Sequence, residues 1–169
     1  MRTLVRLVLG VAALVGLGFV GLLLYGPERA WERIAPSDLG PVDFARLTRS
    51  PTPNDALAAT PGALPDGAPA ADIALPAFDA TPAALLEAVD ARATAEGAER
   101  VAADGTTLRF VTRSPRLRFP DTTVVEAVPL PDGRIGLRAY ARASVGHSDL
   151  GANAARLERW LTGLPGEAS

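Results

Sequence analysis

The sequence of 169 residues contains no cysteine and a single histidine, His147. Thiol nucleophiles, disulfide frameworks and zinc sites built from cysteine or paired histidines are therefore excluded. Lysine is also absent, so all 17 basic residues are arginine. With 19 acidic residues the formal net charge is −2 and no basic stretch stands out, which argues against nucleic acid as a partner. We expect no cofactor and no metal site.

Aromatic residues are scarce as well. They make up 5% of the chain although hydrophobic residues make up 48%, so a core must be built mainly from Leu, Val, Ile and Ala. After an N-terminal apolar run and a Pro-rich stretch, roughly 100 residues remain, which is enough for one domain with one core. We expect no second independent domain.

A long uncharged run lies near the N-terminus. Residues 7–24 read LVLGVAALVGLGFVGLLL, which at about 1.5 Å per residue is long enough to cross the hydrocarbon of a bilayer. Arg2 and Arg6 precede the run, so the positive-inside rule places residues 1–6 in the cytoplasm. No A-x-A cleavage site follows it. We expect residues 7–25 to be an uncleaved signal anchor in a bacterial inner membrane, with the domain in the periplasm.

Residues 26–71 are predicted to form a membrane-proximal tether. Residues 27–34, PERAWERI, favour a short interfacial helix with a proline at its first position. Seven prolines and few periodic apolar residues lie within residues 36–69, a pattern typical of extended chain. Within this stretch, Asn54 and Asp55 are expected to form a turn that fastens the tether to the domain.

A folded domain is predicted for residues 72–164, followed by a tail of residues 165–169. Apolar periodicity and turn signals predict a strand near Ile73, a helix from Thr81 to Gly97, an Asp-Gly hairpin over 99–113, strands over 122–128 and 134–142, and a closing helix capped by Asn153. The fold class is therefore α+β, in the order β-α-β-β-β-β-α. We expect an antiparallel meander sheet with both helices on one face and the other face open, an arrangement that is helix-grip-like by analogy.

Four segments carry a resemblance to a known family: GPVDFARL (40–47), SPTPNDAL (50–57), RSPRLRFPD (113–121) and VGHSDLGANAARLERWL (145–161). Over about residues 40–164 the chain resembles the bacterial domain-of-unknown-function family 1499. The most specific part is a closing G-x-S-D-x-G-x-N signature, present as Gly146, Ser148, Asp149, Gly151 and Asn153. The family often carries Ser and Arg around the last strand, where this chain has Ala141 and Ser144. The resemblance implies no established activity.

The signature loop is one candidate site for a ligand or partner. Ser148, Asp149 and Asn153 could face a ligand, because Gly146 and Gly151 permit tight turns and a helix N-terminus offers free N–H groups. The alternative is that these residues only cap the last helix and fix the turn before it.

A second candidate site surrounds the central loop and the open sheet face. Arg113, Arg118 and Asp121 flank that loop, where an arginine could hold a carboxylate or phosphate headgroup. Strand alternation places Arg138 and Arg142 on the same sheet face as Arg113. The alternative is a solvated face crossed by pairs of arginine and glutamate.

The leading interpretation is a membrane-anchored, periplasm-facing, non-enzymatic module that binds a small apolar or anionic molecule such as a lipid. The ligand would lie between the sheet and the last helix, in a pocket lined by Leu108, Phe110, Leu137, Ala139, Ala141 and Trp160. One alternative is a structural or scaffold partner in a cell-envelope complex. A remote alternative is a hydrolase that uses His147 with Asp149, although the sequence offers no partner that would orient the imidazole. We assign no catalytic residue.

Overall fold

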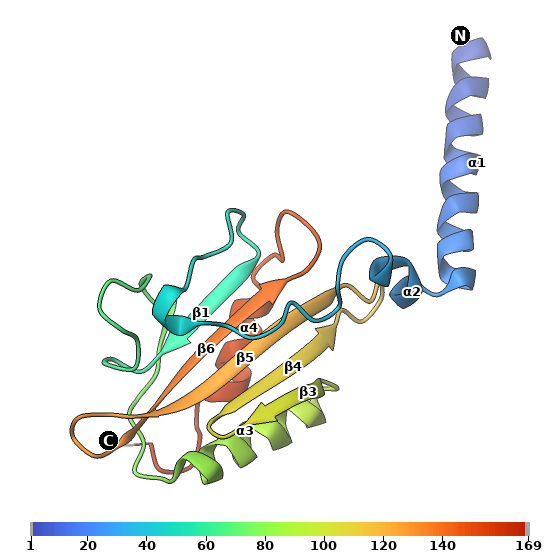
Figure 1. Ribbon diagram of the computed structural model, residues 1–169. Helices are drawn as coiled ribbons and strands as arrows, with labels where there is room; N and C mark the ends of the chain where they lie inside the picture. The colour runs from blue at the N-terminus through green and yellow to red at the C-terminus, as the bar shows by residue number, and fades with distance from the viewer. Residues whose placement is uncertain (1, 168–169) are drawn as a thin grey trace.

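The computed structural model describes residues 2–167 (Figure 1). In chain order its elements are α1 (Arg2–Tyr25), α2 (Pro27–Glu32), the 3-10 helix η1 (Phe44–Arg46), β1 (Asp55–Ala59), β2 (Ile73–Ala74), α3 (Pro82–Ala95), β3 (Glu99–Asp104), β4 (Thr107–Arg113), β5 (Pro120–Pro129), β6 (Ile135–Ala143) and α4 (Ala152–Leu161). The strands form one sheet in the order β2-β1-β6-β5-β4-β3. The α+β class is confirmed, and the predicted order corresponds to β2, α3, β3 to β6 and α4.

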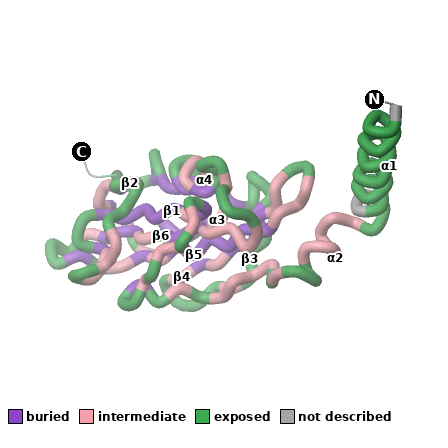
Figure 2. The backbone as a smooth tube through the Cα atoms, turned by 90° about the horizontal axis from the view of Figure 1, so that it is seen from above, coloured by how far each residue is buried: buried purple, intermediate pink, exposed green. Residues whose placement is uncertain are grey.

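The N-terminal helix α1 stands apart from the rest of the protein (Figure 2). Its apolar span Thr3–Gly21 has none of its residues buried inside the protein. By length and composition this helix could cross a membrane as an anchor, or serve as a signal sequence. The short helix expected after it is present as α2, which begins with a proline and follows a glycine of positive φ, Gly26.

The meander and its preceding helix form as the sequence predicts. Thr81 caps α3, because its side chain accepts a hydrogen bond from the N–H of Ala84 (3.2 Å), and Gly97 at φ 81° ends the helix turn. The β3–β4 turn contains Gly105 at φ 53°, as an Asp-Gly hairpin requires. Strands β3 to β6 pair antiparallel in sequence order. Local turn and cap chemistry therefore fixes this half of the domain.

The sheet contains a strand that we did not expect. Residues 55–59, inside the stretch predicted to be a tether, form β1, which pairs antiparallel with β6 and parallel with β2. Four of its five residues are buried. The segment DALAA has no alternation because both of its faces are covered, and it is flanked by prolines, so its sequence did not indicate a strand. Residues 26–71 are thus partly integral to the domain, and the sheet is mixed.

The second face of the sheet is covered, which corrects the expectation of an open face. The chain after α2 runs across the front of the sheet towards η1 (Figure 1). Phe44 of η1 packs with Leu57, Val124 and Tyr140 in a second apolar cluster. Proline-rich chain can lie flat on a sheet without completing a helix or strand of its own, and this explains why its packing role left no periodic signal.

The main core lies between the other sheet face and the two helices α3 and α4. The six residues expected to line a ligand pocket there, namely Leu108, Phe110, Leu137, Ala139, Ala141 and Trp160, are at most 7% exposed and belong to this cluster. Trp160 meets Phe110 edge to face, with ring centroids 5.4 Å apart. Leu85, Val89 and Leu157 join the same cluster, so side chains from the helices occupy the space assigned to the ligand. The small alanines of the sheet permit close helix packing there.

Candidate functional site

Helix α2 docks on the loop between β4 and β5, residues 114–119. The ring of Trp31 lies 4.6 Å from that of Phe119, and the Trp31 indole N–H donates to the carbonyl of Leu117. Arg118 of the same loop pairs with Glu28 of α2 at 2.6 Å. The β6–α4 loop, residues 144–151, lies at this same end, because the N–H of Ser144 donates to the carbonyl of Pro120. We call this end of the domain the α2 end.

A buried ion pair lies at the α2 end, on the helix side of the sheet. Asp121 near the start of β5 pairs with Arg156 in the first half of α4. The Oδ2 atom of Asp121 and the Nη2 atom of Arg156 are 2.8 Å apart, and each side chain is 11% exposed. Burial raises the pKa of Asp121, and the charge of Asp149 adds to this, against the lowering effect of Arg156. Perturbed carboxyl groups of this kind are typical of functional sites.

Two adjoining pockets surround this ion pair. The polar pocket has a volume of about 290 Å³ and is lined by Glu96, Thr112, Asp121, Arg156, Arg159 and Trp160 among others. The apolar pocket has a volume of about 260 Å³ and is lined mainly by Phe119, Ala143, Val145, Gly146 and Leu150. Ser114, Asp121 and Ala152 line both. A single molecule with a polar group and an apolar part could therefore reach across the two pockets.

The polar pocket contains hydrogen-bonding groups that nothing satisfies. The indole N–H of Trp160 and the hydroxyl of Thr112 are buried and have no hydrogen-bond partner within residues 2–167. The indole N–H of Trp160 lies close enough to the Glu96 carboxylate to help Arg159 lower the pKa of Glu96. The N–H and the carboxylate nevertheless do not form a hydrogen bond of ordinary geometry. Leaving such groups unpaired is costly, so they point to a role beyond packing.

The signature loop is held in place by its own polar side chains. The carboxylate of Asp149 accepts hydrogen bonds from the N–H groups of Gly151 (3.0 Å) and Asn153 (2.9 Å), and the Ser148 hydroxyl accepts one from Leu150. These bonds fix the turn before α4, and the bond from Asn153 to Asp149 satisfies an N–H of the first turn of the helix, as the capping alternative describes. The carboxylate of Asp149 is committed to the backbone, so it does not orient the exposed imidazole of His147.

Asn153 has a different role from the predicted one. It lies inside α4 and is fully buried, while the residue at the N-cap position is Gly151 at φ 80°. Its side-chain amide donates to the carbonyl of Asn54 (3.1 Å), and the amide of Asn54 in turn donates to the carbonyl of Gly146 (2.8 Å). Asn153 was expected to cap the helix because Asn is common at that position. Instead, the two asparagines join the signature loop to the start of β1.

Of the predicted arginines, Arg113 is among the residues that line the polar pocket, whereas Arg118, Arg138 and Arg142 line neither pocket. Arg138 pairs with Glu126 at 2.9 Å, and Arg142 donates to the carbonyl of Leu39 (2.8 Å) beneath the covering segment. Arg113 shares this face by register, and its guanidinium lies 3.7–4.0 Å from carboxylates of Glu28, Glu32 and Glu99. The pairing alternative therefore describes Arg138 well, and Arg113 and Arg118 face α2.

Sequence reasoning missed most of the polar side chains of the polar pocket, namely Glu96, Thr112, Ser114, Arg156 and Arg159. Arg156 lies three residues after Asn153 and three before Arg159, so helical spacing could have placed Arg156 beside each of them on the last helix. Nothing in the sequence shows that Asp121, which is 35 positions away, faces Arg156. Within residues 2–167 the His, Asp and Glu side chains form no group of three that could hold a metal ion.

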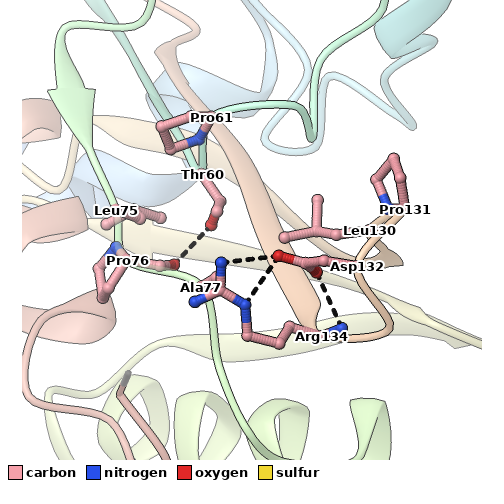
Figure 3. Close-up of a pocket in the computed structure, with 9 residues that line it drawn as sticks. All are labelled: Thr60, Pro61, Leu75, Pro76, Ala77, Leu130, Pro131, Asp132 and Arg134. Carbon is pink, nitrogen blue, oxygen red and sulfur yellow. Dashed lines mark hydrogen bonds and ion pairs between the residues drawn. The ribbon is translucent and has the colours of Figure 1, made fainter. Parts of the chain in front are cut away.

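A further pocket lies at the opposite end of the domain, beside the β5–β6 turn (Figure 3). Its volume is about 340 Å³. Its polar side chains satisfy one another, because Arg134 pairs with Asp132 at 2.7 Å and the Thr60 hydroxyl donates to the carbonyl of Pro76 (2.8 Å). With no unpaired buried group and no link to α2, it is a weaker candidate than the pockets at the α2 end.

Comparison with known proteins gives one match. The model of a family described as "Protein of unknown function (DUF1499)" matches residues 47–164, which contain β1 to β6, α3, α4 and both pockets. No curated protein and no solved structure matches the chain.

Proposed function

The chain belongs to the DUF1499 family of proteins of unknown function, and on that premise we propose that it is a membrane-anchored, periplasm-facing, non-enzymatic module that binds a lipid-like amphiphile. The amphiphile lies at the α2 end of the domain. Its apolar part occupies the apolar pocket and its headgroup the polar pocket.

The observation that carries this proposal is the pairing of two chemically different pockets at one place. They share Ser114, Asp121 and Ala152, yet one is walled by apolar side chains and the other by charged ones. Small-molecule sites are typically apolar with a few convergent polar groups and begin at roughly 300 Å³. Each pocket is close to that size, so together they suit a headgroup with the first part of an acyl chain.

The position of the pockets supports a membrane lipid as the source of the ligand. Helix α2 follows α1 after Gly26 and docks on loop 114–119, which borders both pockets through Ser114 and the apolar one through Phe119. In this proposal α1 is an uncleaved anchor in a bacterial inner membrane, with Arg2 and Arg6 on the cytoplasmic side. A lipid from the outer leaflet then has a short path to the domain.

One observation favours a second candidate, a scaffold partner in a cell-envelope complex. Leu150 at the tip of the signature loop is 94% exposed and adopts a positive φ of 55°. An exposed apolar side chain held in a strained conformation is typical of a residue that contacts another molecule. A partner protein that covers Leu150 would close the apolar pocket from outside.

The test is native mass spectrometry, with lipid extraction, on the full-length protein taken gently from its own membrane. We expect one bound amphiphile per chain. The variant Ala152→Trp places an indole at the wall common to both pockets and should remove that amphiphile. The matched control Ala77→Trp fills the pocket at the opposite end and should leave the amphiphile bound.

Two results would contradict the proposal. One is a wild-type chain that carries no amphiphile, and if it carries a polypeptide instead, the scaffold candidate replaces the lipid-binding one. The other is equal retention of the amphiphile by both tryptophan variants, which would place the ligand elsewhere on the protein.

A further inference from the structure

The unused hydrogen-bonding capacity of the polar pocket lies mostly in donors. The Trp160 indole can only donate, and although the Glu96 carboxylate lies near it, its N–H makes no hydrogen bond of ordinary geometry within the described residues. Arg156 has five N–H groups, of which one bonds the side chain of Asn153 and one the carboxylate of Asp121. The hydroxyl of Thr112, also unpartnered within residues 2–167, can donate as well. A ligand that satisfies these groups must present several acceptors.

The charges of the pocket do not oppose such a ligand. Asp121 is paired with Arg156 at 2.8 Å, and Glu96 is held by two hydrogen bonds from Arg159. Each carboxylate is therefore matched by a guanidinium. The second oxygen of Asp121 accepts no hydrogen bond within residues 2–167, and burial raises the pKa of this carboxyl, which favours its protonation beside an anion.

We propose that the polar pocket recognises an oxyanion, a phosphate or carboxylate group, through the indole N–H of Trp160, the hydroxyl of Thr112 and the guanidinium of Arg156. This inference rests on the proposed function and names the headgroup chemistry of its ligand. Hydrogen bonds to an ionised acceptor are about twice as strong as hydrogen bonds between two neutral groups. An oxyanion would therefore compensate well for the burial of these unpaired donors. The same chemistry could be met by a lipid headgroup or by a free anion.

The experiment uses the two tryptophans of the chain as reporters. Full-length ¹⁵N-labelled protein in dodecyl maltoside micelles gives two indole N–H signals, which the variants Trp31→Phe and Trp160→Phe assign. Dihexanoyl phosphatidylglycerol and inorganic phosphate are titrated separately, with dihexanoylglycerol as the lipid that lacks a phosphate. We expect the Trp160 signal to move downfield with the phospholipid. The Trp31 signal should stay, because that indole already donates to Leu117.

Matched variants separate recognition from packing. Thr112→Val keeps the shape and removes an unpartnered hydroxyl, so we expect phospholipid affinity to fall about tenfold while the ligand-free protein unfolds no more easily than the wild type. Thr122→Val is the control. Its hydroxyl accepts from the N–H of Leu39 (2.9 Å) on the other sheet face, so this variant should lose stability and keep its affinity.

The outcomes are distinct. A Trp160 shift with phospholipid alone supports a lipid headgroup, and a shift with inorganic phosphate as well supports a site for free oxyanions. The inference is overturned if the Trp160 signal shifts with neither the phospholipid nor inorganic phosphate and the Thr112→Val variant binds phospholipid as tightly as the wild type. If the wild-type protein nevertheless carries an extracted amphiphile that Ala152→Trp loses, the proposed function stands and only the oxyanion contact is wrong.

Discussion

At the scale of single residues, Asp55 is the most heavily engaged polar side chain in the domain. It begins β1, its side chain is 5% exposed, and its carboxylate accepts from Arg49 at 2.8 and 2.9 Å. It also accepts from the hydroxyl of Tyr140 and from the N–H of Ser50. These contacts tie the segment before β1 to the centre of β6, and thereby hold the layer that covers the second sheet face.

We predict that Asp55→Asn destabilises the protein by about 3 kcal/mol, because it removes one partner of a largely buried ion pair and leaves Arg49 with fewer acceptors. Urea unfolding followed by circular dichroism measures this change. Asp66→Asn removes an equal charge from an exposed position and is the control, with an expected change below about 0.5 kcal/mol. Equal effects of the two substitutions would contradict the prediction.

The same site predicts a dependence of stability on pH. Burial alone would raise the pKa of Asp55, but hydrogen bonds from Arg49, Tyr140 and Ser50 outweigh it and lower the pKa. The stabilisation is therefore present above about pH 4, the ordinary range of an aspartate, and is lost as the pH falls through the lowered value. Burial and Asp55 raise the pKa of Tyr140 to about 12. The contribution of the protonated Tyr140 hydroxyl to stability is therefore full below about pH 10 and is lost as the pH rises through 12. Asp55→Asn should abolish the acid part of this profile.

At the scale of elements, the two asparagines fasten α4 and its signature loop to β1. Asn153 is buried and spans from α4 to the carbonyl of Asn54, so its removal leaves that carbonyl and Arg156 with one bond fewer each. The sequence-based expectation that Asn54 fastens the tether to the domain agrees with these contacts. That expectation named no partner, and the structure shows the partners to be Gly146 and Asn153.

We predict that Asn153→Ala lowers the free energy of unfolding by about 2 kcal/mol, since buried groups lose their hydrogen bonds. Glu158→Ala on the exposed side of α4 is the control, because no hydrogen bond to its carboxylate occurs within residues 2–167. Amide hydrogen exchange should show faster exchange in residues 144–153 for Asn153→Ala alone. Unchanged protection of that loop would mean that the asparagine pair does not hold it.

At the scale of the whole molecule, the folded domain begins earlier in the chain than residue 72, where the sequence predicted its start. Strand β1 lies between β2 and β6, and the covering segment before it buries Phe44 against the sheet. The described side chains of helix α1, in contrast, contribute nothing to either apolar cluster. Helix α1 and the domain are therefore separate in folding terms, and the contacts with loop 114–119 come from α2.

We predict that a chain beginning at residue 27 folds with one cooperative transition, whereas a chain beginning at residue 61 does not. The second chain loses β1 and exposes the edge of β6, including the buried Leu137, Ala139 and Ala141. Thermal unfolding by circular dichroism and near-ultraviolet signals of Tyr140 distinguish the two. A cooperative transition in the shorter chain would show that the domain folds without β1, as the predicted boundary at residue 72 implied.

The sequence by itself determined the features that depend on local chemistry. The uncharged run of residues 7–24, the Thr81 cap with its proline, and the Asp-Gly turn each depend on residues close in the sequence, so they could be predicted without partners. The tertiary structure alone decided β1, the cover over the second sheet face, and the meeting of Asp121, Arg156 and Trp160. These features join segments far apart in the chain, where small or isolated residues carry no periodic signal, and their burial follows only from the assembled layers.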